Sequence, residues 1–127
     1  MSFHLLDALA RKANPALTPT LDTEHLHRVL DYIDDNMHER IKTQAPAKIA
    51  GFSESHFSKL FKSTTGMTTY GYVTRRRLQL AEALLRMGKM RIVDVAVEVG
   101  FYDQSHLDRS FQRFCQCSPI EFARKAR

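Results

Sequence analysis

The chain has 127 residues, a formal net charge of +5 and two cysteines. Cys115 and Cys117 stand too close together in the sequence to close a stabilising disulfide loop, and no apolar run approaches the roughly 20 residues that a membrane-spanning helix needs. The composition therefore predicts a cytoplasmic protein with no membrane partner, of one ordinary domain or two very small ones.

The charge is divided unevenly along the chain. Residues 22–41 hold six acidic residues against two arginines, whereas residues 42–127 hold fifteen Lys or Arg against seven acidic residues. A basic excess of this size favours a polyanionic partner, because neutralising phosphates releases condensed counterions. On charge alone, a basic surface without any partner is an equal alternative.

The N-terminal part divides into an arm and a helix. Pro15 and Pro19 separate residues 1–20 from the rest, and we expect a mobile arm there, with a turn or two of helix as the alternative. The segment that follows, residues 22–37, has apolar residues at helical spacing and acidic residues on the other side. Asp22 or Thr23 can cap this helix.

Two later segments repeat each other. GFSESHFSKLF occupies residues 51–61, and GFYDQSHLDRSF occupies residues 100–111. The preceding residues match as well, since an alanine stands four positions before each glycine, at Ala47 and Ala96. Alanine allows two helices to cross closely, and glycine adopts the left-handed conformation of a tight turn. Each copy therefore predicts a helix-turn-helix unit, and the second has one extra residue between its Gly-Phe and Ser-His pairs.

The second helix of each unit has one face that repeats and one that differs. The inward face is apolar in both copies, as at Phe57 and Leu107. The outward face is polar and differs between the copies: Ser55, Ser58, Lys59 and Lys62 in the first, and Gln104, Ser105, Asp108, Arg109 and Gln112 in the second. A shared scaffold with two different polar faces is typical of two readers of different DNA sequence.

A long helix is expected between the copies, from Thr68 to Gly88. The predicted fold is therefore all-α: two helix-turn-helix subdomains, residues 21–67 and 89–127, joined by a long central helix over residues 68–88. A helix of about 18 residues spans about 27 Å. Consecutive major grooves recur about every 34–36 Å, so two recognition helices at its ends could enter them if the DNA bends toward the protein.

Other classes of site find no support in the sequence. The histidines and the two cysteines lack the spacing of a zinc site, so packing is the preferred interpretation of the cysteines. We find no nucleophile elbow, phosphate loop or clustered carboxylates. The prediction is a protein that is not an enzyme and uses no cofactor or metal.

Residues 22–127 resemble the AraC/XylS family of transcription regulators. The most specific match to the family's C-terminal signature is IVDVAVEVGFYDQSHLDRSFQRFCQCSPIEF. Because no sensor domain precedes this region, the chain resembles the short MarA/SoxS/Rob-like members. The resemblance implies a monomeric activator that binds double-stranded DNA through two helix-turn-helix units and contacts RNA polymerase. The acidic residues of 22–41 either meet the polymerase or form a solvated charged face.

The family's base-facing positions can be carried over residue by residue. They fall here on Ser55, His56, Ser58 and Lys59 in the first unit and on Gln104, Ser105, Asp108 and Arg109 in the second. Arg109 can pair with guanine and Gln104 with adenine. Asp108 either orients Arg109 or accepts from cytosine. Gln116 departs from the family, which usually has glycine there, and this predicts a weaker helix end.

Some positions have two interpretations. Lys59 and Lys62 are expected to meet phosphates, with Lys59 also within reach of a base. His56 and His106, at matching places near the helix starts, either reach a phosphate or have a plain surface or capping role. The run Arg75–Arg77 wraps around its helix, so one arginine is expected to be a structural partner and one or two to touch the DNA backbone.

A protein-interaction module that docks an acidic partner is the alternative function. It would keep the helix-turn-helix fold and use the basic face for a protein. The outward residues of the second helices are polar and lack the aromatic anchors of a protein interface. DNA reading is therefore preferred.

Overall fold

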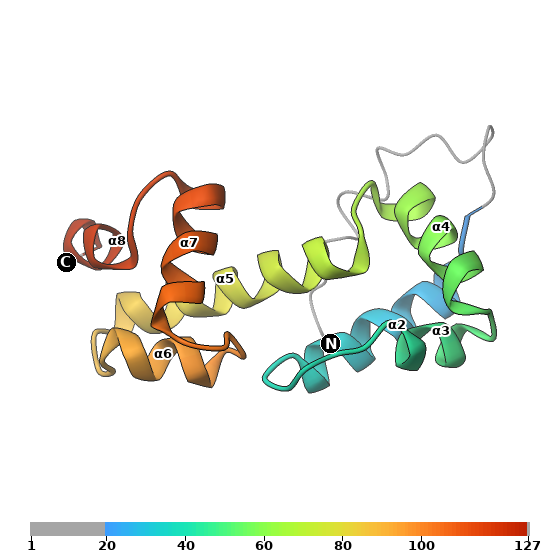
Figure 1. The fold of residues 1–127 in the computed structure, drawn as a ribbon, viewed down its shortest axis with the longest axis horizontal. Coiled ribbons are helices and arrows are strands. Elements are labelled where there is room, and N and C mark those ends of the chain that lie inside the picture. Colours follow the sequence, from blue (N-terminus) through green and yellow to red (C-terminus); the bar gives the residue numbers. More distant parts are fainter. Residues whose placement is uncertain (1–19, 127) are drawn as a thin grey trace. The chain divides into compact units, whose positions relative to one another are not determined.

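The computed structural model describes residues 20–126, and the predicted arm, apart from Thr20, lies outside the described residues. Across the described range the chain is helical and has no strand (Figure 1). The helices are α2 (Thr23–Asn36), α3 (Gln44–Ala50), α4 (Glu54–Thr65), α5 (Thr69–Met87), α6 (Ile92–Glu98), α7 (Gln104–Cys115) and α8 (Pro119–Lys125). The all-α prediction is confirmed. None of these helices is long and apolar enough to span a membrane.

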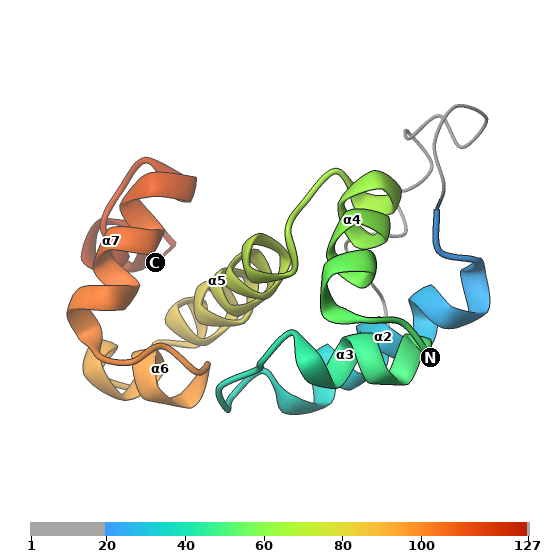
Figure 2. The ribbon, with the colours of Figure 1, turned by 45° about the vertical axis from the view of Figure 1, so that its right-hand side comes forward.

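The chain divides into two compact units. The first contains the residues up to Asn36 together with Ile41–Val73, and the second contains Met37–Arg40 together with the chain from Thr74 onward. The long helix α5 begins in the first unit and continues into the second. Each unit carries one helix-turn-helix, α3–α4 in the first and α6–α7 in the second (Figures 1 and 2).

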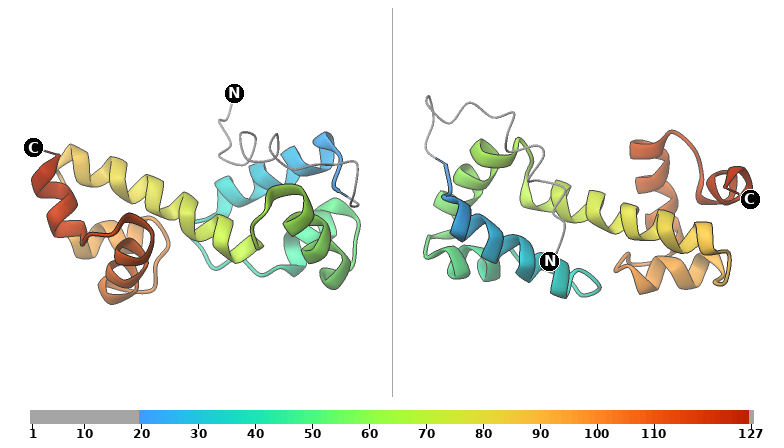
Figure 3. Two further views of the ribbon diagram at one scale, coloured as in Figure 1. Left: turned by 90° about the horizontal axis from the view of Figure 1, so that it is seen from above. Right: turned by 180° about the vertical axis from the view of Figure 1, so that it is seen from behind.

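The first unit packs α2, α3 and α4 around one core (Figure 3). Helix α2 begins where the carboxylate of Asp22 accepts a hydrogen bond of 2.8 Å from the N–H of His25, so Asp22 rather than Thr23 provides the cap. The buried side chains come from all three helices and from the start of α5: Leu26, Val29, Leu30, Ile33, Ala47, Ala50, Phe57, Leu60, Phe61, Tyr72 and Val73. The apolar residues at helical spacing therefore form this core, as the pattern predicts.

The second unit has its own core, built by α6, α7 and the larger part of α5. The buried side chains are Leu78, Ala81, Leu85, Val95, Ala96, Val99, Phe101, Leu107 and Phe111. Helix α8 closes this core, where Phe122 packs edge-on against Phe111 with ring centroids 5.4 Å apart. Its N-terminus is a capping box, in which Ser118 and Glu121 each accept from the other's backbone N–H.

The two tight turns share one geometry. Gly51 has φ +81° and Gly100 has φ +98°, both in the left-handed region. The following phenylalanines donate equivalent backbone hydrogen bonds, from Phe52 to the oxygen of Ala47 at 3.0 Å and from Phe101 to the oxygen of Ala96 at 2.9 Å. The sequence repeat is therefore a structural repeat, and glycine satisfies the backbone conformation that each turn requires.

The helices begin and end at residues that favour helix ends, although not every such residue makes a capping hydrogen bond. Thr68 caps α5 by accepting from the N–H of Gly71 at 3.0 Å, and α5 ends before Gly88, which has φ +68°. Thr43 occupies the N-cap position of α3, but its side chain makes no capping hydrogen bond. Gln116 ends α7 in the left-handed conformation, with φ +57°. A non-glycine residue therefore carries the strain at that helix end.

Candidate nucleic-acid interface

Helix α4 presents one polar side to solvent. Ser53 fixes its start by accepting from the N–H of His56 at 3.2 Å. Phe57, Leu60 and Phe61 point into the core, which leaves the other side of the helix exposed. All five residues predicted for DNA binding in this unit are exposed there: Ser55, His56, Ser58, Lys59 and Lys62.

Helix α7 has the same construction with different residues. Asp103 caps it by accepting from the N–H of His106 at 2.8 Å. Leu107, Ser110 and Phe111 are buried. The predicted DNA-binding residues lie on the remaining surface, where Ser105, Arg109 and Gln112 are exposed and Gln104 and Asp108 are half-buried. Helices α4 and α7 thus have equivalent caps and equivalent buried sides but expose different polar residues. The contacts of these exposed residues with bases stay a prediction.

The matching histidines have a structural role that the sequence left open. The ring of His56 packs edge-on against Phe52, with centroids 4.8 Å apart, and the ring of His106 packs in the same way against Phe101 at 4.9 Å. Each histidine therefore packs the start of its helix, α4 or α7, against the phenylalanine of the preceding turn. A phosphate contact from His56 stays a prediction beside this packing role.

His106 is held more tightly than its counterpart. Its Nδ1 atom accepts a hydrogen bond of 3.2 Å from the backbone N–H of Tyr102, which leaves the ring proton on Nε2. Burial lowers the pKa of His106, the cations Arg109 and Arg77 lower it further, and Asp103 opposes them. The neutral imidazole is thus the form that this turn requires.

The arginine run of α5 separates into different roles. Arg77 is buried and donates from Nε to the oxygen of Met37 and from Nη2 to the oxygen of Glu39, both at 2.8 Å. Arg75 lies over the ring of Phe114, 5.2 Å from its centroid. The expectation that one arginine of the run is structural is confirmed, and that arginine is Arg77.

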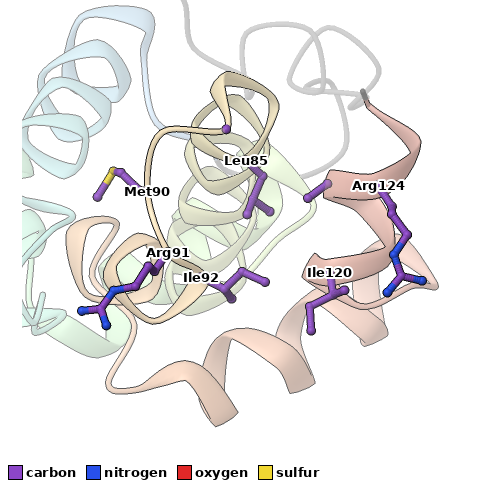
Figure 4. Close-up of a pocket in the computed structure, with 8 residues that line it drawn as sticks. Leu85, Met90, Arg91, Ile92, Ile120 and Arg124 are labelled. Atoms are coloured by element: carbon purple, nitrogen blue, oxygen red, sulfur yellow. The ribbon is translucent and has the colours of Figure 1, made fainter.

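A pocket of about 300 Å³ lies in the second unit between the end of α5, the start of α6 and α8 (Figure 4). Leu85, Ile92 and Ile120 supply apolar walls, with Arg91 and Arg124 also lining it. The guanidinium of Arg91 is engaged by Asp94, with Nε and Oδ2 2.9 Å apart. None of the ten residues predicted to contact DNA lines this pocket.

The cysteines lie in packed surroundings. Burial, and to a lesser extent the nearby carboxylate of Glu82, raises the pKa of the Cys115 thiol to about 11. Both cysteines are unbridged and half-buried. Among residues 20–126, no three His, Cys, Asp or Glu side chains are grouped as metal ligands would be.

One exposed residue beside α7 is missing from the sequence-based set. Tyr102 precedes the cap Asp103, and 86% of its surface is accessible to solvent. The signal for it was the extra residue of the second copy, which the repeat revealed without indicating a role.

Residues 47–125 match the HTH_18 family model, which describes a helix-turn-helix domain of the AraC/XylS type. The chain belongs to the AraC/XylS family. It is 34% identical over 101 residues to the probable transcriptional regulator LumQ of Photobacterium leiognathi, a match that covers 78% of this chain and 41% of LumQ. It thus spans less than half of that relative. With the regulatory protein SoxS of Salmonella typhimurium the identity is 27% over 97 residues, covering 76% of this chain and 91% of SoxS.

Solved structures of AraC/XylS domains share the fold. The DNA-binding domain of AdpA, determined in complex with a target DNA, superposes with a TM-score of 0.74 at 25% identity, covering 79% of this chain and 90% of that one. An AraC-type regulator from Chromobacterium violaceum gives a TM-score of 0.75 at 23% identity, covering 81% and 92%. These matches agree with the arrangement of two helix-turn-helix units.

Proposed function

We propose that this AraC/XylS-family chain is a sequence-specific DNA-binding transcription regulator that reads two consecutive major grooves with α4 and α7. The observation that carries the proposal is the repeated frame with two different polar faces. In both units a capped helix follows a glycine turn and buries equivalent apolar residues, while its exposed residues differ. Two helices that read different half-sites need the same supporting structure but different exposed residues, and α4 and α7 have this combination.

The roles of individual residues follow from their chemistry. Arg109 offers the fork of donors that matches guanine, and Gln104 offers the donor and acceptor that match adenine. Asp108 is assigned to orienting Arg109. Lys59 and Lys62 carry only point charges and are assigned chiefly to phosphates. Contacts of this kind divide the interface into residues that specify sequence and residues that hold the backbone.

The protein acts as a monomer, with residues 21–67 and 89–127 as its two reading subdomains. One chain already holds two readers, so no second copy is needed for a site of about two helical turns. We assign it the role of an activator that contacts RNA polymerase, in keeping with its resemblance to the SoxS-like regulators. The acidic outer side of α2 is a candidate surface for that contact.

Selection of duplexes from random DNA, followed by footprinting and sedimentation of the complex, tests the proposal. We expect an asymmetric site with one chain bound. A two-fold symmetric footprint carrying two chains would exclude the monomeric mode. Failure to enrich any duplex sequence would exclude sequence-specific DNA binding and would favour the alternative function, docking to an acidic protein.

A further inference from the structure

The second helix-turn-helix contains one residue that the first lacks. In the first unit Phe52 is followed directly by the cap Ser53, whereas in the second Tyr102 stands between Phe101 and the cap Asp103. The two histidines keep the same distance from their caps, because each donates its N–H to the cap three residues earlier. The insertion is therefore confined to Tyr102, directly before the recognition helix.

The fold fixes the backbone of Tyr102 and leaves its side chain in solvent. Its N–H donates to Nδ1 of His106 at 3.2 Å, and the His106 ring packs edge-on against Phe101 on the other side of the insertion. The N–H of His106 is in turn held by Asp103. The inserted residue is thus held by contacts with one histidine, while 86% of its own surface is exposed. Because the backbone at this position is already fixed, a ligand contact has to order only the side chain of Tyr102.

We propose that Tyr102 is a DNA-contacting residue whose phenol O–H donates a hydrogen bond to a backbone phosphate beside the α7 half-site. The inference rests on the proposed function of α7 as a reader of the major groove. The N-terminal residues of a recognition helix lie nearest the base edges, and the residue before its cap lies at the same end of the helix. Tyrosine hydroxyls are among the neutral donors that bind phosphate oxygens.

A neutral donor makes a distinctive prediction. Lysine contacts release counterions, so their removal flattens the dependence of affinity on salt. The phenol of Tyr102 carries no charge at neutral pH, so its contact adds affinity without adding to the salt slope. Because a phosphate is present whatever the base sequence, the contribution should be equal on selected and random DNA.

The test compares the full chain with Tyr102→Phe and Tyr102→Ala on the selected duplex and on random duplexes at several salt concentrations. Tyr102→Phe is the matched variant, because it removes only the hydroxyl. We expect both variants to lose affinity about 10- to 150-fold, the range for one hydrogen bond to a charged group. The loss of affinity should be the same on the selected and on the random duplexes, and the slope of log affinity against log salt should not change. Unchanged melting temperatures establish that both variants are folded.

Three results would overturn the assignment. Wild-type affinity of Tyr102→Phe together with weak binding by Tyr102→Ala would exclude the hydroxyl as the contact and assign the contact to the ring. A loss confined to the selected site would make Tyr102 a base reader instead. Wild-type affinity of both variants would leave the exposed ring as an anchor for a protein. If the unmodified chain bound no duplex, the proposed function itself would fail, and this outcome is separate from all three.

Discussion

The Nε atom of Arg77 donates a hydrogen bond of 2.8 Å to the carbonyl oxygen of Met37, forty residues earlier in the chain. A second bond of 2.8 Å, from Nη2 to the oxygen of Glu39, fastens the same short segment. Arg77 is 8% exposed. A guanidinium in this position joins parts of the second unit that are remote in sequence.

Replacing Arg77 should therefore destabilise the protein. Arg77→Ala removes the donor from two carbonyl groups, and we expect a loss of about 2–4 kcal/mol in the free energy of unfolding. Arg75→Ala, at an exposed position two residues earlier, serves as the control and should cost about 1 kcal/mol or less. Thermal and denaturant melting give the measurement, and equal losses for the two variants would contradict the assigned role of Arg77.

The two turn glycines should differ in their tolerance of alanine. A Cβ on Gly51 would meet nothing within 4 Å, whereas a Cβ on Gly100 would lie 2.2 Å from the oxygen of Met37 and 2.8 Å from Nε of Arg77. Gly51→Ala carries only the cost of the left-handed conformation, about 1–2 kcal/mol. Gly100→Ala adds a clash with backbone. Its loss in the free energy of unfolding, measured by denaturant titration, should therefore be at least twice that of Gly51→Ala. A smaller loss for Gly100→Ala than for Gly51→Ala would contradict this packing.

Glycine at the end of α7 should stabilise the protein. The backbone of Gln116 is strained by a positive φ, which glycine adopts without strain. Gln116→Gly should therefore raise the free energy of unfolding by about 0.5–1 kcal/mol. The control is Gln112→Gly within the same helix, which should lower that free energy by about 1 kcal/mol. Destabilisation by Gln116→Gly would mean that the bond of its side-chain Nε2 to the oxygen of Arg113, at 3.3 Å, outweighs the strain.

Base readers and phosphate contacts should separate in binding assays. Arg109→Ala should lose about 1–3 kcal/mol on the selected site and relax preference at one base position. Lys62→Ala should weaken selected and random DNA alike and reduce the salt slope by about one unit. Arg109 would be reassigned to the phosphate backbone if its removal weakened random DNA as much as the selected site.

The thiol of Cys115 should be slow to alkylate. Its pKa, raised from 9.0 to about 11, lowers the thiolate fraction near pH 8 about 100-fold, and only the thiolate is nucleophilic. Mass spectrometry of the folded chain over a pH series should show a rate of modification at Cys115 that rises about tenfold per pH unit and levels off only near pH 11. The denatured chain is the control and should react at ordinary rates. Rapid labelling of folded Cys115 at pH 8 would show that burial does not protect it.

Sequence periodicity and the repeat predict most of the helices and turns of the two units, because caps, glycine turns and apolar spacing are local signals. The caps Ser53 and Asp103 and the left-handed glycines Gly51 and Gly100 lie where these signals indicate. The repeat also defines the outward faces, although any base contacts that these faces make depend on a DNA sequence that the protein sequence does not contain.

The remaining features depend on contacts between distant residues. The sequence indicates that one of three neighbouring arginines is structural, but choosing Arg77 requires the position of the Met37–Arg40 segment. The histidines illustrate the same limit. His56 and His106 occupy matching places, yet only His106 also binds the backbone of an inserted residue, because the first unit has no such residue.

The attachment of Met37–Arg40 to Arg77 also bears on the modularity of the chain. This segment belongs to the second unit but precedes the helix-turn-helix of the first. No single cut of the peptide chain can therefore release both units complete. A fragment that begins at Thr74 would lack the carbonyl oxygens of Met37 and Glu39 and would present Arg77 without either acceptor. The two units share one repeated pattern, but they are not separable parts of the chain.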